Sequence, residues 1–154
     1  MSATVLLVGL DSADRDLVVS WADEGRLPTL QKLRRGGVWG EVISLPGLGD
    51  DASWSSFSTG VGPGSHGRFY HHRYLEGTYD LVRSRRDAMS HAPFWERLAD
   101  HDRRVAVIDV PKSPLGRIRN GMVIADWMCH GTDSSGVVSR APVLGDYIAQ
   151  RVVR

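Results

Sequence analysis

The chain has 154 residues, a length typical of one domain, and 42% of them are hydrophobic, which is enough to build a buried core. A formal net charge of +1 excludes the strongly basic balance of proteins that bind nucleic acids or anionic membranes by charge. The single cysteine, Cys129, excludes an internal disulfide, and the apolar run at residues 4–10 is too short for a signal peptide or a membrane span, so we expect a cytoplasmic domain.

The first third of the chain predicts strand, helix, helix and strand in that order. Residues 4–10 (TVLLVGL) form a continuous apolar run, typical of a strand buried on both faces of a parallel sheet. A helix is expected over 13–24 with Ser12 as its N-cap. A second helix is expected over 28–35, opened by proline and ended by two glycines. Residues 38–45 alternate in polarity as a strand does.

The rest of the chain continues this alternation. The further expected segments are a short helix at 53–58, a loop at 60–67, a surface excursion at 69–90, a helix at 92–101, strands at 104–110 and 122–127, a polar loop at 128–139 and a helix at 143–153. Strands that alternate with helices predict right-handed βαβ units. We therefore expect one α/β domain with a mostly parallel sheet and flanking helices.

Carboxylates follow two of the expected strands. Asp11 comes directly after the first strand, and Asp50 and Asp51 follow the 38–45 strand through a Gly-Leu-Gly turn. Functional groups collect at the carboxyl ends of strands in an open α/β sheet, so these residues are expected to converge. Clustered carboxylates repel unless they are protonated or bind a cation. Hard oxygen ligands suit a divalent metal, and a neighbouring histidine favours zinc or manganese.

Each of these residues also has a structural interpretation. Asp11 and Ser53 can be helix caps, Asp50 and Asp51 can complement a helix dipole, His66 can be a hydrogen bonder in a glycine-rich turn, and His71 and His72 can simply be exposed. Composition and pattern alone therefore predict a globular α/β domain with a candidate metal site.

Several short motifs occur in a fixed order along the chain. They are VGLDSAD at 8–14, EGRLPTL at 24–30, the glycine-rich step at 33–40, WSSFSTGVGPGSHG at 54–67, PFWERL at 93–98 and VAVIDVP at 105–111. In this order they resemble the alkaline phosphatase superfamily, and most closely its type I phosphodiesterase/nucleotide pyrophosphatase branch. The resemblance implies an alkaline-phosphatase-like fold and hydrolysis of small-molecule phosphate esters with two divalent metals, commonly zinc.

The resemblance places Asp11 at the first metal ligand. It also places the family's nucleophilic threonine or serine at position 50, where this chain has Asp50 and no hydroxyl. Ser53 is the nearest hydroxyl, and a shifted turn would bring it to the metals. Alternatively, Asp50 and Asp51 bind metal and water attacks directly. A third interpretation is that catalysis has been lost.

Candidate substrate-binding cations are Lys112 and the cluster of His71, His72 and Arg73, which would bind the negative charge of the ester. The family's later Asp-His-Gly ligand signature has no counterpart in this chain. The resemblance therefore implies the N-terminal portion of a longer hydrolase domain, or a degenerate member. An incomplete sheet leaves an open edge and apolar faces, which favours self-association into a homo-oligomer.

The leading hypothesis is a metal-dependent phosphodiester or phosphomonoester hydrolase. The alternative is a non-catalytic module that binds metal or phosphate, because position 50 lacks a hydroxyl. A haloacid-dehalogenase-like phosphatase with Asp11 as nucleophile is disfavoured, since that chemistry needs an acid two residues later, where Ala13 stands.

Overall fold

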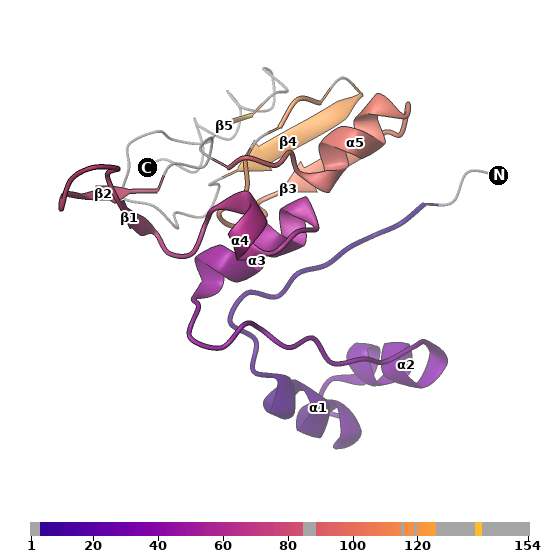
Figure 1. The fold of residues 1–154 in the computed structure, drawn as a ribbon. Coiled ribbons are helices and arrows are strands. Elements are labelled where there is room, and N and C mark those ends of the chain that lie inside the picture. Colours follow the sequence, from indigo (N-terminus) through magenta and orange to yellow (C-terminus); the bar gives the residue numbers. More distant parts are fainter. Residues whose placement is uncertain (1–3, 85–88, 115, 119, 126–137, 140–154) are drawn as a thin grey trace, which may run out of the picture. The chain divides into compact units, whose positions relative to one another are not determined.

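The computed structural model describes residues 4–84, 89–114, 116–118, 120–125 and 138–139. The chain divides into two compact units, residues 1–43 and residues 44–154, and each is described by itself. Figure 1 shows the helices and strands in order along the chain. Every helix in the described part of the chain is too short or too polar to cross a membrane.

The first unit contains two helices, α1 (Arg15–Asp23) and α2 (Pro28–Gly36). Both confirm the sequence prediction, but the N-cap of α1 is Asp14 and not Ser12. The Asp14 side chain accepts a hydrogen bond of 2.9 Å from the backbone N–H of Leu17, which satisfies a donor in the first turn. Arg34 of α2 donates to the Asp23 carboxylate over 2.8 Å and thereby ties the two helices together.

The strands predicted at 4–10 and 38–45 are wrong. Both segments are extended, but neither pairs with another strand among the described residues (Figure 1). Their apolar side chains are correspondingly exposed, with Val5 at 78% and Ile43 at 82%. Apolar patterning expresses a tendency to be buried, whereas a strand also needs a partner edge for its backbone hydrogen bonds. The pattern of apolar residues does not indicate whether a neighbouring strand is present.

The second unit contains the remaining elements. They are α3 (Asp50–Thr59), α4 (Pro63–His66), β1 (His72–Tyr74), β2 (Leu81–Arg83), α5 (Phe94–Asp100), β3 (Val105–Ile108), β4 (Gly121–Ala125) and β5 (Val138–Ser139). The strands β3, β4 and β5 form a three-stranded sheet in that order, and β1 and β2 form an antiparallel hairpin.

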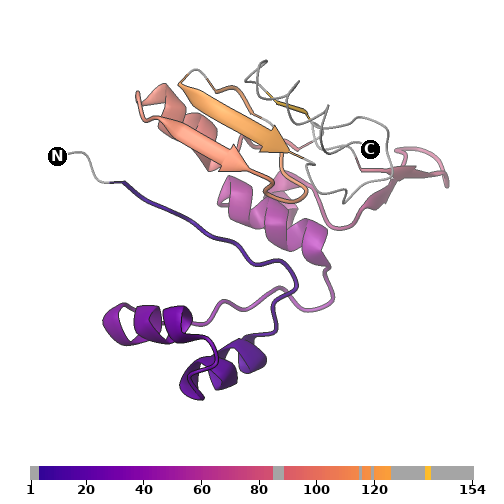
Figure 2. The same cartoon turned by 180° about the vertical axis from the view of Figure 1, so that it is seen from behind.

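The three-stranded sheet carries the core of the second unit. Trp95 of α5 packs against Val107 of β3 and Val123 of β4, and all three side chains are buried. Figure 2 shows α5 beside these two strands. Strand β4 begins at Gly121, which pairs with Val105 at a φ of 144°. A Cβ at Gly121 would lie 1.8 Å from the Val105 carbonyl oxygen, so only glycine permits this register.

The α/β class is confirmed, but a mostly parallel sheet is not. The described sheet has one parallel pair, β3 with β4, and one antiparallel pair, β4 with β5. The helix expected at 92–101 and the strands expected at 104–110 and 122–127 correspond to α5, β3 and β4. The helix expected at 143–153 lies outside the described residues.

Candidate functional site

Helix α3 places the two adjacent carboxylates in different surroundings. The helix begins at Asp50, three residues earlier than the sequence predicted, and Gly49 caps it without a side-chain hydrogen bond. Both acids lie in the first turn, where the helix dipole favours negative charge. Asp50 is exposed, whereas Asp51 is buried with 2% of its surface accessible. Successive helical residues differ by about 100° in direction, which separates the two carboxylates.

Ser53 lies on α3 itself and not in the turn before it. It is exposed, as Asp50 is. Residues three apart on a helix are neighbours on its surface, so Ser53 and Asp50 share one exposed face of the first turn. The structure therefore groups the nearest hydroxyl with the carboxylate that stands at the expected nucleophile position.

The glycine-rich segment after α3 forms a second, very short helix, α4. Gly60 ends α3 in the left-handed conformation, with φ 73°. The loop predicted at 60–67 is wrong in part, because Pro63 opens the four-residue helix α4 and Gly67 closes it with φ 76°. Proline at the first position and a left-handed glycine after the last position are the usual boundaries of a helix. This turn buries His66.

His66 is held by hydrogen bonds to both ring nitrogens. The backbone N–H of Arg68 donates to Nδ1 over 3.1 Å, so Nδ1 carries no proton. Nε2 of the neutral ring must then carry the proton, and it donates to the Ser56 hydroxyl over 3.0 Å. Burial, and then the charges of His91 and Arg68, lower the pKa of His66. His66 is therefore a structural hydrogen bonder and does not act as a base toward Ser56.

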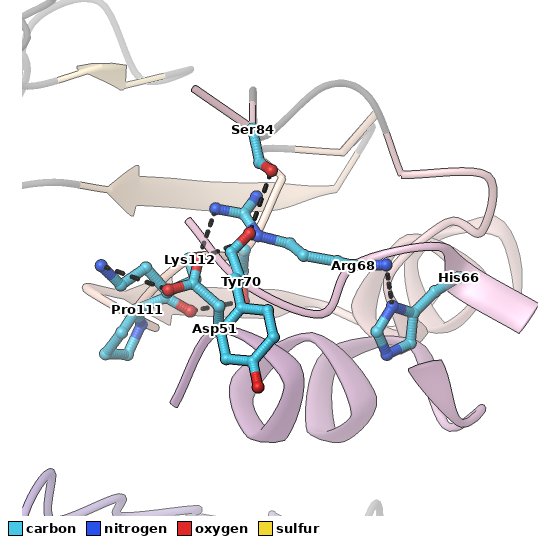
Figure 3. A network of polar contacts seen from close by, with 8 residues as sticks. Asp51, His66, Arg68, Tyr70, Ser84, Pro111 and Lys112 are labelled. Atoms are coloured by element: carbon cyan, nitrogen blue, oxygen red, sulfur yellow. Dashed lines mark hydrogen bonds and ion pairs between the residues drawn. The ribbon is translucent and has the colours of Figure 1, made fainter. Parts of the chain in front are cut away.

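The buried carboxylate of Asp51 faces two cations. Arg68 donates through Nε over 3.0 Å and through Nη2 over 2.8 Å, both to Oδ1 of Asp51. Lys112 places its Nζ 4.0 Å from the other oxygen, Oδ2 (Figure 3). Asp51 and Arg68 are both more than nine-tenths buried, and Lys112 is partly buried. We call Asp51, Arg68 and Lys112 the Asp51 ion-pair cluster.

Arg68 is a residue of this cluster that no sequence motif singled out. The available signal was its position directly after Gly67, because a left-handed glycine redirects the chain at the end of a helix. That signal locates Arg68 near α4 but does not identify its partner, which lies 17 residues earlier in the sequence. Only the packing of α3 against α4 brings the two side chains together.

Lys112 reaches the cluster from a strained loop at the carboxyl end of β3. Asp109 and Lys112 both have positive φ, 50° and 57°, which is uncommon outside glycine. The Ser113 hydroxyl donates to the Pro111 carbonyl oxygen over 3.1 Å and tightens the same loop. Such backbone strain is typical of functional loops. The loop lies where the sequence predicts functional groups, after a buried strand.

The predicted cation cluster at His71, His72 and Arg73 lies at the start of the exposed hairpin. His72 pairs with Arg83, and Arg73 pairs with Val82. Successive strand residues point to opposite faces, so His72 and Arg73 do not form one patch. His71 packs edge-on against His72, with ring centroids 4.5 Å apart. All three side chains are exposed, whereas Asp51 and Arg68 are buried.

The hairpin is anchored at its base to the turn before α3. The Tyr70 hydroxyl donates to the Gly47 carbonyl oxygen. The Ser84 hydroxyl donates to the Tyr70 carbonyl oxygen over 3.0 Å. The Ser84 backbone N–H donates to the His71 carbonyl oxygen over 2.8 Å. Figure 3 shows Tyr70 and Ser84 close to the ion-pair cluster.

The carboxylates predicted to bind metal are distributed over both units. Asp11 lies in the first unit, and Asp50 and Asp51 lie in the second. In the described ranges, no group of three or more histidine, cysteine, aspartate or glutamate side chains is arranged to hold a metal ion. Asp51 accepts two hydrogen bonds from Arg68, both through Oδ1.

Comparison with known proteins bears on the whole of this site. The model of the type I phosphodiesterase / nucleotide pyrophosphatase family matches residues 5–127, which include α3, α4, the hairpin and the loop that carries Lys112. No curated protein and no solved structure matches the chain. The chain belongs to the type I phosphodiesterase / nucleotide pyrophosphatase family.

Proposed function

We propose that the domain contributes the phosphate-ester site of a metal-dependent hydrolase that acts on phosphodiesters or phosphomonoesters. The observation that carries this proposal is the family match over residues 5–127. The first turn of α3 supports it, since its backbone N–H groups suit an anion and Asp50 stands at the place of the family's nucleophile. Lys112 adds a positive side chain beside that turn.

Asp50 serves as a general base in the proposed reaction. A water molecule attacks phosphorus and transfers a proton to the Asp50 carboxylate, the P–O bond to the leaving alcohol breaks, and the alcohol takes a proton from solvent. A divalent metal, zinc or in its place manganese, supplies Lewis-acid stabilisation of the phosphoryl charge when bound. Asp50 is the ligand that we propose in the second unit, and Asp11 is the ligand that we propose in the first unit. A cytoplasmic location is proposed from the single cysteine.

A second route keeps the family's covalent step on a different side chain. Ser53 shares the exposed face of α3 with Asp50, so the carboxylate could accept the serine proton while Oγ attacks phosphorus, the P–O bond to the leaving alcohol breaks and the alcohol takes a proton from solvent. Hydrolysis of the resulting phosphoserine by water would then restore Ser53. Direct attack by water is the simpler route, because a serine in the first turn of a helix also acts as a local hydrogen bonder.

The experiment is hydrolysis of bis(para-nitrophenyl) phosphate and para-nitrophenyl phosphate with zinc or manganese supplied. Turnover that EDTA abolishes and that Asp50→Asn removes would support the proposal. Asp100→Asn is the matched control, because Asp100 is an exposed acid at the end of α5. Phosphate retained on the wild-type protein and lost in Ser53→Ala would favour the covalent route. Absence of turnover with either metal would contradict the hydrolase function.

A non-catalytic module that binds metal or phosphate is the second candidate function. The observation in its favour is the carboxylate of Asp50 at the position where the family has a nucleophilic hydroxyl. Binding of inorganic phosphate or zinc without any ester hydrolysis would support it. Turnover that depends on Asp50 would exclude it.

A further inference from the structure

Asp50 and Asp51 are neighbours in sequence, yet their contacts differ in kind. We propose that Asp51 is a positioning residue that serves as the internal counter-ion of Arg68 and Lys112 and does not bind metal. Asp50 is then the single carboxylate of the pair that is open to a metal or a substrate. This inference rests on the proposed function only where it assigns a ligand role to Asp50.

The hydrogen bonds of Asp51 are the first argument. Its Oδ1 accepts from both Nε and Nη2 of Arg68, at 3.0 and 2.8 Å. Arginine presents these donors as a rigid planar fork, and here both donors converge on one oxygen, so the contact holds Oδ1 in place. Both side chains are buried, and a buried arginine needs an anionic partner. Asp51 cannot turn toward a metal without breaking both of its hydrogen bonds to Arg68.

The local charge balance is the second argument. Asp51 supplies one negative charge to two cations, with Arg68 on Oδ1 and Lys112 at 4.0 Å from Oδ2. A divalent cation placed on Asp51 would lie close to both positive groups, and such repulsion is strong at a site shielded from water. The cluster is suited to a carboxylate that stays in place.

The position of Arg68 in the chain shows what the contact accomplishes. Its backbone N–H donates to Nδ1 of His66 in α4, while its side chain binds Asp51 in the first turn of α3. One residue thus joins the end of α4 to the start of α3. Asp50 is the residue before Asp51 on the same turn, so the ion pair also determines where the Asp50 carboxylate stands. Asp51 acts on the site through this geometry.

The test combines a double-mutant cycle with zinc binding. Asp51→Asn, Arg68→Gln and the double variant are compared with Asp50→Asn for melting temperature and for affinity toward zinc alone, measured by calorimetry. We expect Asp51→Asn and Arg68→Gln each to lower the melting temperature by on the order of 10 °C, because each disrupts the buried, charged hydrogen bonds between Arg68 and Asp51. The double variant should lose less than the sum of the two.

Measurements of zinc affinity distinguish a residue that binds the metal from one that only positions its neighbour. We expect Asp50→Asn to weaken zinc binding without a large change in melting temperature, and Asp51→Glu, which retains the negative charge, to bind zinc as the wild type does. Additive losses in the double-mutant cycle would overturn the proposal, as would loss of zinc binding in Asp51→Glu at a temperature where that variant is folded. If the wild type binds no zinc, the proposed metal dependence fails, and the cycle by itself still decides the role of Asp51.

Discussion

Arg68 binds Asp51 through two nitrogen atoms to a single carboxylate oxygen, at 3.0 and 2.8 Å, across 17 residues of sequence. The pair joins the first turn of α3 to the residue that follows α4. Because both side chains are buried, this contact is stronger evidence for how the site is built than any single motif in the chain.

Replacing Arg68 tests the geometry of its contact as well as its charge. We expect Arg68→Gln to cost about 3–5 kcal/mol in the free energy of unfolding, because the buried Asp51 carboxylate loses the two hydrogen bonds that Arg68 donates to it. Arg68→Lys keeps the charge but loses the planar fork, so it should cost less than Arg68→Gln and still be destabilising. Urea denaturation measures both. Arg73→Gln, in the exposed hairpin, is the matched control and should change stability by less than about 0.5 kcal/mol.

The buried ring of His66 makes stability depend on pH. Burial lowers the pKa of His66 in the folded protein, and the positive charges of His91 and Arg68 lower it further. The unfolded chain therefore binds a proton more readily than the folded chain, so this contribution to stability is complete above the ordinary histidine pKa of about 6.5 and is lost as the pH falls through the folded value.

Thermal unfolding between about pH 5 and pH 8 measures this effect. We expect His66→Gln to flatten the acid side of the stability curve, even though the variant is less stable at neutral pH. His101→Gln is the control, because His101 is exposed and should leave the slope unchanged. An unaltered slope in His66→Gln would show that another group titrates in this range.

Gly121 tests the parallel pairing of β3 and β4. We expect Gly121→Ala to destabilise the protein by more than about 2 kcal/mol, because the new Cβ would collide with the backbone of Val105 and the φ of 144° disfavours alanine. Gly62→Ala is the matched control, since Gly62 has a φ of −78° and open space around it. Equal melting temperatures for the two variants would contradict the described register.

The cap of α1 provides a test in the first unit. We expect Asp14→Ala to cost about 1 kcal/mol, because the Leu17 N–H loses its hydrogen bond and the helix loses a favourable charge at its start. Ser12→Ala should cost less, since Ser12 is not the cap. Denaturation followed by circular dichroism compares the two. A larger loss in Ser12→Ala would restore Ser12 as the cap.

Replacing Asp50 by threonine tests whether position 50 is the proposed nucleophile position. We expect Asp50→Thr, with zinc supplied, to accumulate a covalent para-nitrophenyl phosphoryl group at position 50 after incubation with bis(para-nitrophenyl) phosphate, because a hydroxyl at the proposed nucleophile position would attack phosphorus and displace one para-nitrophenolate. Peptide mass spectrometry detects the adduct. Asp50→Val has a similar shape without the hydroxyl and should carry none. Equal labelling of both variants would place the nucleophile elsewhere.

The local elements were predictable because their signals are local. Pro28, the glycines that end helices and the 3.6-residue period of apolar positions locate α1, α2 and α5 within a few residues. The apolar run at 105–108 likewise identified β3. The same reasoning failed at 4–10 and 38–45, since a strand exists only where a second strand supplies hydrogen-bond partners, and that partner is not encoded nearby.

The candidate site was likewise predictable from the sequence only in part. The sequence alone determined the family, the acidic start of α3 and the cation Lys112 after β3, because motif order and residue type can be read without coordinates. The tertiary structure alone decided that Asp51 is buried on Arg68 while Asp50 remains exposed. Adjacent residues of a helix point in different directions, and which direction meets a partner depends on packing between distant segments.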